Sequence, residues 1–460
     1  MPVALRVRKT ADWLSVNSFA GDKRRALVGG AGIGGLAAAA ALANHFDEVV
    51  VIEKDDLSDG AAIRKGVGQG AHIHVLMKGG EMSLEKNLPA IRTDFLKDGA
   101  IELIAGKDQV VFDYESHRPL RDLGFTQLCM SRPGYERVIR RRVSALPNVT
   151  IRQGVRINRL VLDDGAAVGF EIRADEENQF IGGAFVVDAR GRGSPLPREL
   201  EAYGCGAVMD ETIGINMAYA SARIRPGSAN DRLRASFMCV PEPPDVRYGL
   251  AFPVEDGEWI VSLGGRGDIV PSTEQEEFLE FARALAAPDI YELLHGADFS
   301  GAIHRYKKPT ANWRHYESLG TFPKRLAVVG DTIASYNPIY GQGMSVAIKH
   351  AEILGDTLQR YALDDKRLYR ELMAKAALVT VQAWKFAASN DFAYPEVTGA
   401  RDPDFERQQA FRRALRKACD EDPEIHRLVI EVSNMMRSPA ALMDPAVVAR
   451  VEAKMAETVD

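Results

Sequence analysis

The sequence predicts an α/β fold in which a parallel sheet carries an inserted antiparallel sheet and is followed by a helical C-terminal region. Wholly apolar runs at residues 26–28 and 49–52 are typical of buried parallel strands. Residues 249–254 and 259–263 suit an antiparallel sheet with one covered face. From residue 366 onward the pattern is helical, with prolines that separate the helices.

The composition restricts the class of protein. In 460 residues, 46% hydrophobic and 27% charged side chains exclude a disordered chain, a coiled coil or a collagen-like fibre. The net charge of −6 gives no field for attracting nucleic acid or anionic lipid. Four widely spaced cysteines suit neither a disulfide framework nor a zinc site. No apolar run approaches the ~20 residues of a spanning helix, and residues 1–22 should be a solvated lead-in, so we expect a cytoplasmic protein.

The first segment with chemical meaning spans residues 25–55. A short apolar strand is followed by the triad Gly30-x-Gly32-x-x-Gly35, an alanine-rich helix and a second strand that ends at Glu53. This order of strand, glycine turn, helix, strand and acid is the dinucleotide-binding pattern. A glycine triad alone would often be a structural turn, but here both strands and the acid are in register. The segment therefore predicts a bound dinucleotide, either FAD or NAD.

Each glycine of the triad has its own physical reason. Gly30 permits a tight turn, Gly32 lets the backbone approach a pyrophosphate, and Gly35 lets the helix pack close to the sheet. The helix N-terminus offers unpaired N–H groups and a positive dipole end to the phosphates. Glu53 can accept both hydroxyls of an adenosine ribose, and its charge would repel a 2′-phosphate.

A later segment, residues 327–344, again places an acid after a strand. The strand ends at Asp331, and a loop with Pro338, Gly341 and Gly343 leads into a helix. The aspartate can hold a ribityl or ribose hydroxyl, and the helix start can stabilise negative charge on the N1/C2=O edge of a reduced flavin. Taken alone, this segment would more often be a structural turn.

A third segment, residues 185–197, has the same order. An apolar strand ends at Asp188, and Gly191, Gly193 and Ser194 follow. From the pattern alone, the aspartate could be merely a helix or turn cap.

These three segments, in their order and spacing along the chain, resemble the FAD-dependent monooxygenases of the para-hydroxybenzoate hydroxylase-like superfamily. Three further motifs are similar to bacterial polyether-type epoxidases and related oxygenases within it: IRKGVGQGAHIHVL at 63–76, SRPGYERVIRRRV at 131–143 and NPIYGQGM at 337–344. The last motif is specific, whereas the glycine triad is not. The resemblance runs from about residue 26 into the C-terminal helices.

The resemblance implies a Rossmann-like FAD-binding domain with an inserted antiparallel-sheet substrate domain. It implies a monooxygenase in which a flavin C4a-hydroperoxide transfers one oxygen from O2 to an electron-rich apolar or aromatic substrate, by epoxidation or hydroxylation. Alternatives are an FAD-dependent reductase or dehydrogenase acting on a prenyl-like or other alkene, and a flavin-binding regulator. The FAD-binding residues it implies are Gly30, Gly32, Gly35, Glu53, Lys54, Arg64, Arg132, Asp188, Asp331, Pro338, Gly341, Gly343 and Met344.

One departure from the family bears on electron supply. Many single-component hydroxylases carry Asp-Gly where this chain has Asp188-Ala189. The resemblance therefore argues against direct docking of NAD(P)H, and a separate flavin reductase is the expected partner that passes on its electrons.

Catalytic side chains are few, because the cofactor performs the oxygen chemistry. An epoxidation needs no general base; a phenol hydroxylation would, and His74 and Tyr340 are the candidates. His72 and His74 share one side of an extended segment. No further ligand stands at a supporting spacing, so no metal site is predicted. A hydrogen-bonded structural role remains the alternative for both histidines.

The predicted cofactor domain is discontinuous. It comprises residues 26–78, 131–206 and 311–361. Residues 79–130 and 207–310 should form the substrate domain, which would cover the isoalloxazine ring, and residues 362–460 a helical region packed on it.

Overall fold

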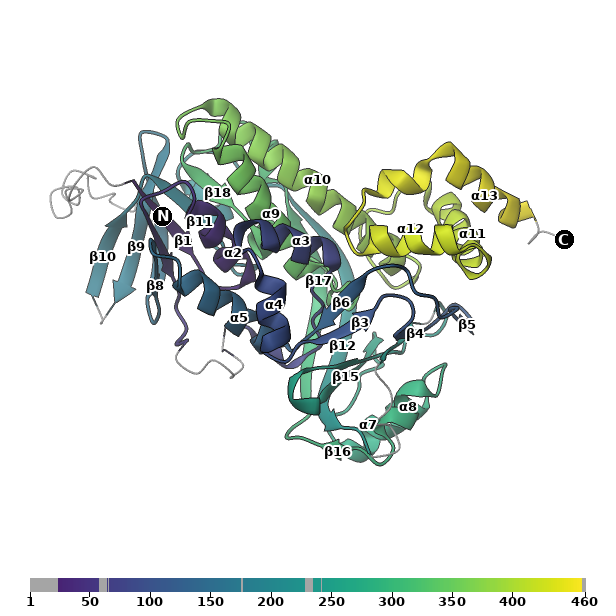
Figure 1. Ribbon diagram of the computed structural model, residues 1–460. Helices are drawn as coiled ribbons and strands as arrows, with labels where there is room; N and C mark the ends of the chain where they lie inside the picture. Colours follow the sequence, from purple (N-terminus) through teal and green to yellow (C-terminus); the bar gives the residue numbers. More distant parts are fainter. Residues whose placement is uncertain are drawn as a thin grey trace.

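The computed structural model confirms the predicted fold class, with a parallel sheet, an inserted antiparallel sheet and C-terminal helices (Figure 1). It describes residues 24–57, 64, 66–174, 177–227, 235–240 and 242–456. Residues 1–22, for which we expect a solvated lead-in, lie outside the described residues. The same holds for Ile63 and Lys65 of the motif at residues 63–76.

A five-stranded parallel sheet supports the first part of the candidate site. Its strand order is β18-β11-β1-β2-β7. The strands are β1 (Arg25–Gly29), β2 (Glu48–Ile52), β7 (Val149–Arg152), β11 (Phe185–Asp188) and β18 (Leu326–Val328). β11 pairs with both β1 and β18, so the three segments singled out in the sequence become neighbours. Parallel strands end at one edge of the sheet, and the acids and glycine turns therefore gather there.

Six helices accompany this sheet, and a small residue permits the close contact between two of them. The helices are α2 (Ile33–Leu42), α3 (Lys78–Asn87), α4 (Ile91–Lys97), α5 (Arg132–Ser144), α6 (Leu196–Ala202) and α9 (Gly343–Leu358). α9 packs against α2 and α3, and α5 packs against α2 and α4. A Cβ at Gly80 in α3 would stand 2.6 Å from the Cβ of Ser345 in α9, so only glycine permits this approach.

The antiparallel sheet has nine strands and two different faces, and one of its strand pairs, β4 with β13, is parallel. Its order is β19-β17-β12-β15-β14-β13-β4-β5, with β16 paired to β12. Residues alternate along β14: Ala251 packs in the core under α7 and α8, while Tyr248, Leu250 and Phe252 line cavities on the other face. The elements are β4 (Gln109–Asp113), β5 (Ser116–His117), β12 (Asp210–Arg225), β13 (Ser236–Val240), β14 (Tyr248–Pro253), β15 (Trp259–Arg266), β16 (Asp298–Phe299), β17 (His304–Arg314), β19 (Ala334–Ser335), α7 (Gln275–Arg283) and α8 (Asp289–Leu294).

The remaining elements are two small sheets and the C-terminal helices. One sheet pairs β3 (Ile101–Ile104) with β6 (Thr126–Cys129). The other, β8 (Arg156–Asp163), β9 (Ala166–Ala174) and β10 (Glu177–Gly182), was not foreseen in the sequence. The helices are α10 (Lys366–Asp391), α11 (Phe405–Glu421), α12 (Pro423–Ser433) and α13 (Pro445–Ala456), and α10 runs alongside α9 (Figure 1). Within the described part of the chain, no helix is long and apolar enough to cross a bilayer.

We keep the three-part division of the chain as a proposal, with one adjustment. Residues 79–97 form α3 and α4, which pack against α9 and α5 of the parallel-sheet domain. We therefore group these residues with that domain.

Candidate functional site

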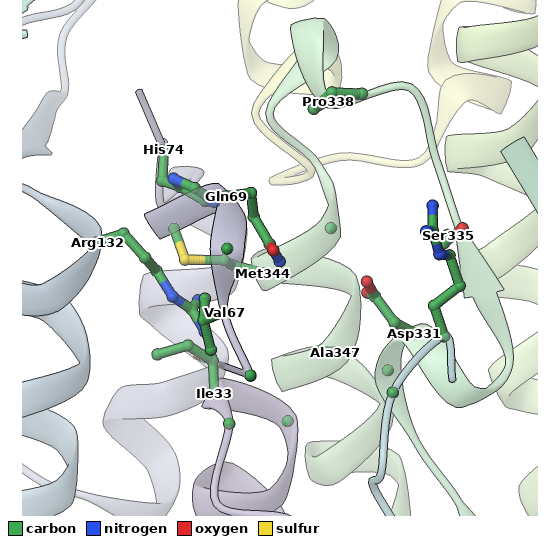
Figure 2. A pocket seen from close by; sticks show the side chains of 18 of the residues that line it. Ile33, Val67, Gln69, His74, Arg132, Asp331, Ser335, Pro338, Met344 and Ala347 are labelled. Atoms are coloured by element: carbon green, nitrogen blue, oxygen red, sulfur yellow. The ribbon is translucent and has the colours of Figure 1, made fainter. Parts of the chain in front are cut away.

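A cavity of about 830 Å³ lies at the carboxyl edge of the parallel sheet. All three segments identified in the sequence contribute to its wall: the first glycine turn, residues 189–193 and the stretch from Val329 to Ala347. Figure 2 shows His74 and Arg132 on one side of the cavity and Asp331 on the other. The structure thus brings together residues from distant parts of the sequence around one cavity.

The glycine triad has the geometry that its sequence pattern predicts. Gly30 has a φ of +104°, which other residues rarely adopt. A Cβ at Gly35 would stand 1.9 Å from the carbonyl oxygen of Gly30, so this position requires glycine for packing. A Cβ at Gly32 would meet no atom within 4 Å, because this residue faces the open cavity.

Glu53 and Arg64 close the wall behind this turn. Glu53 Oε2 accepts a hydrogen bond from the Ala31 amide at 2.7 Å, and Oε1 accepts one from the Asp55 amide at 3.0 Å. Arg64 Nη1 lies 3.3 Å from Glu53 Oε2, and Arg64 Nε lies 2.7 Å from Glu136 Oε1. The positive charge of Arg64 is therefore already compensated. Lys54 also lines the cavity and is exposed.

Asp188 is buried beneath the wall rather than exposed in it. Its carboxylate accepts hydrogen bonds from the Arg190 amide at 2.9 Å, the Arg190 side chain at 2.6 Å and the Ser194 hydroxyl at 2.9 Å. These bonds fix the loop that follows β11. A Cβ at Gly191 or Gly193 would meet nothing within 4 Å, so this loop presents bare backbone to the cavity.

Asp331 and Lys308 both line the cavity. Burial raises the pKa of Asp331, while Lys308, Arg132 and Arg192 oppose the rise. Lys308, in β17, donates to Ser335 Oγ at 2.9 Å, and burial lowers its pKa to about 8. Sequence reasoning missed Lys308, because nothing in the pattern separates it from its neighbour Lys307.

Arg132 and His74 form the opposite side. Arg132 Nη2 lies 3.2 Å from Glu136, and its buried Nε has no hydrogen-bond partner among the described residues. Burial, followed by the charge of Arg132, lowers the pKa of His74 to about 3, so this imidazole is neutral. Its Nδ1 lies 3.0 Å from the His72 carbonyl oxygen and must donate to it, which leaves Nε2 as an acceptor.

His72 has a structural environment. It is 3% exposed, its Nδ1 lies 2.7 Å from Ser221 Oγ, and burial lowers its pKa to about 4. No group of three metal-ligating side chains occurs among the described residues.

The loop before α9 forms the far end of the cavity. Asn337 Oδ1 accepts a hydrogen bond from the Ile339 amide at 3.2 Å, and Gly341 adopts a φ of +65°. A Cβ at Gly343 would have only Asp331 nearby, at 3.9 Å. Pro338 and Met344 complete this part of the wall. The N-terminus of α9 therefore opens toward the cavity.

A second cavity, of about 1100 Å³, lies on the other side of this loop. Val75, Leu250, Pro338, Ile339 and Gly341 line both cavities, so one apolar wall separates them. The antiparallel sheet and helices α10 to α13 enclose the rest.

The two catalytic candidates are not brought together. Tyr340 lines the second cavity, and its hydroxyl donates to Asp391 Oδ1 at 2.9 Å, whereas His74 lines the first. Asn337 and Arg266 bind the same carboxylate oxygen. Sequence reasoning missed Arg266 and Asp391, which lie 125 positions apart and carry no local motif.

Comparisons with known proteins agree on the fold. No protein-family profile matches the chain. Protein Rv3254 of Mycobacterium tuberculosis is 31% identical over 395 residues, which cover 82% of each chain. The flavin-dependent brominase Bmp2 is similar with a TM-score of 0.67 and 13% identity, over 95% of this chain and 98% of that one. PqsL of Pseudomonas aeruginosa, a probable FAD-dependent monooxygenase, is similar with a TM-score of 0.60 and 15% identity, over 87% of this chain and 98% of that one.

Proposed function

Because the chain belongs to the same family as Protein Rv3254 and has the fold of flavin-dependent monooxygenases, we propose that it is an FAD-dependent monooxygenase. The observation that carries the proposal is the form of the first cavity. Its wall presents bare backbone at Gly32, Gly191 and Gly193 and reaches the N-terminus of α9. A long, flat, anionic cofactor needs backbone approach along its length and positive helix ends at its charged parts.

The residues of this wall fit FAD. The turn at Gly32 and the N-terminus of α2 would hold the pyrophosphate, and Glu53 the adenosine ribose. Asp331, whose carboxylate borders the cavity, would accept a ribityl hydroxyl. The partnerless Nε of Arg132 supplies a buried donor for the cofactor. The N-terminus of α9 would face the pyrimidine edge, where negative charge develops on reduction.

When bound and reduced, FAD would supply the activation of O2, so that one oxygen atom enters an electron-rich apolar or aromatic substrate, by epoxidation or hydroxylation, and the other leaves as water. The chain's own task is to orient the substrate and exclude water. Val75, Leu250 and Ile339 form the apolar wall between the two cavities and serve that purpose. The substrate would occupy the second cavity.

The neutral state of His74 suits a hydrogen-bond acceptor rather than a proton donor. His74 lines the first cavity, so its Nε2 would accept a hydrogen bond from the cofactor rather than act as a base toward a substrate in the second cavity. The hydroxyl of Tyr340 is engaged by Asp391, so we assign Tyr340 a positioning role instead of that of a base.

Oxygen transfer is tested with protein loaded with FAD, reduced by dithionite without O2, and then mixed with ¹⁸O₂ and a panel of polyenes and aromatics. One labelled oxygen atom per product molecule is the expected result, and FAD-free protein is the control. Product formation from an alkene without O2 would instead establish the reductase alternative.

Electron supply is tested separately. We propose that electrons from NAD(P)H arrive through a flavin reductase, since Ala189 stands where many single-component hydroxylases carry glycine. NADPH alone should bleach the flavin slowly in a stopped-flow instrument, and an added flavin reductase should accelerate turnover. Fast, saturable reduction by NADPH alone would remove the need for the reductase and leave the oxygenase proposal intact.

A further inference from the structure

Asp391, the last residue of α10, is a buried junction between three parts of the molecule. It is 1% exposed. Its Oδ1 accepts hydrogen bonds from Arg266 Nη2 at 2.5 Å, Asn337 Nδ2 at 2.7 Å and Tyr340 Oη at 2.9 Å. The donors come from β15 and from the loop before α9, so one carboxylate oxygen joins the C-terminal helices, the antiparallel sheet and that loop.

The charge of Asp391 is compensated locally. Arg266 is 5% exposed, donates to the Ile215 carbonyl oxygen at 3.2 Å and lies 4.2 Å from the ring centroid of Tyr394. Removing two charges from water costs several kcal/mol per ion, so a buried pair adds little net stability over well-packed apolar residues. Stability alone therefore does not explain this arrangement.

The loop held by Asp391 is the wall between the two cavities. Pro338, Ile339 and Gly341 line both of them, and the same loop leads into the N-terminus of α9. Asn337 serves two purposes, because its Oδ1 caps the Ile339 amide while its Nδ2 donates to Asp391. A change in these bonds would move the cofactor-facing and the substrate-facing surfaces of the loop together.

We propose that Asp391 is a positioning residue, which through Asn337 and Tyr340 sets the position of residues 337–341 between the two cavities. The end of α10 thereby fixes the geometry of a site that the parallel-sheet domain supplies. The inference rests on the proposed function for its catalytic consequence, whereas the effect on the loop requires no cofactor.

Two variants and a matched control test this inference. Tyr340→Phe removes one hydrogen bond and no charge, and Asp391→Asn removes the charge while keeping the shape. Glu396→Gln is the control, because it removes a carboxylate charge five positions after Asp391 from an exposed side chain that lines neither cavity. Hydrogen–deuterium exchange on FAD-free protein should show at least about tenfold faster exchange at residues 339–343 in both variants, with unchanged rates in β1 and β2.

The loaded protein supplies the second measurement. Both variants should shift the flavin reduction potential and lower kcat with little change in KM, and Glu396→Gln should match the parent protein. If Asp391→Asn fails to fold, Tyr340→Phe alone decides the test. Unchanged exchange at residues 339–343 in the folded variants would overturn the inference. Altered exchange without any flavin binding would retain the role of Asp391 in the loop and contradict the proposed function.

Discussion

Gly32 and Gly35 stand in one turn and meet opposite physical demands. A Cβ at Gly35 would collide with the Gly30 carbonyl oxygen at 1.9 Å, so this glycine is required by the protein itself. A Cβ at Gly32 would meet nothing within 4 Å, and its φ of −73° and ψ of 177° are open to any residue. The fold alone thus gives no reason for glycine at position 32, and a ligand does.

Gly32→Val should therefore give folded protein without FAD. The valine side chain would enter the space assigned to the pyrophosphate and leave the turn intact. We expect a melting temperature within a few degrees of the parent and loss of the absorbance near 450 nm of bound flavin.

Gly35→Ala is the contrasting variant. Its Cβ collides with backbone, and overpacking of this kind costs about 1–3 kcal/mol or more. It should melt at a clearly lower temperature. A Gly32→Val protein with full flavin absorbance would contradict the placement of the cofactor.

At the scale of single elements, local sequence predicted the strands and the turns but not their partners. The strands expected at residues 26–28 and 49–52 are β1 and β2, because wholly apolar runs identify buried parallel strands. The sheet of β8 to β10 was missed because β8 and β10 are largely polar and exposed, although β9 between them is largely apolar. Lys308 was missed for a related reason. Its strand, β17, is largely polar, and nothing in that sequence indicates that this lysine is buried.

The N-terminus of α9 is the element with the clearest test. Gly343→Val would project a side chain from the first turn of the helix toward Asp331, with no protein atom closer than 3.9 Å. The variant should separate the helix N–H groups from the flavin, weaken FAD binding and lower the flavin potential. Substrate oxidation should fall further than FAD affinity, with more H2O2 released per NAD(P)H consumed.

Gly320→Val is the control for this element. Gly320 also has open space around it but does not line either cavity. The variant should keep the parent's flavin reduction potential and its ratio of product formed to NAD(P)H consumed. The same values in Gly343→Val would mean that this loop is only a structural turn.

At the scale of the whole molecule, the site depends on contacts that no local pattern encodes. The first cavity could be predicted because parallel strands bring their carboxyl ends to one edge. The second cavity and the junction at Asp391 could not, because they depend on how the C-terminal helices pack on the antiparallel sheet. Tyr340 and Asp391 lie 51 positions apart, and Arg266 lies 125 positions from Asp391. Sequence reasoning therefore named Tyr340 without finding the partner of its hydroxyl.

Four histidines, three of them buried and His74 half-buried, make the whole molecule sensitive to acid. Burial lowers the pKa of His72, His350 and His426 to about 4 and that of His74 to about 3, each from 6.5. Because the folded pKa is the lower one, the unfolded chain binds more protons between these values, and stability falls as the pH drops from 6.5 toward 4. At 1.36 kcal/mol per pH unit, one such histidine costs about 3 kcal/mol at pH 4.

His350 offers the sharpest test of this dependence, because it is 0% exposed. Its Nδ1 accepts a hydrogen bond from the Gly330 amide at 3.2 Å, and its Nε2 lies 3.1 Å from Thr380 Oγ1. His350→Gln should be less stable at pH 7.5, where these bonds are lost, yet its stability should fall less steeply between pH 6.5 and 4, because one proton fewer is taken up on unfolding. Urea unfolding at several pH values measures this slope. Equal slopes for the parent and His350→Gln would show that His350 is protonated in the folded protein, contrary to its burial.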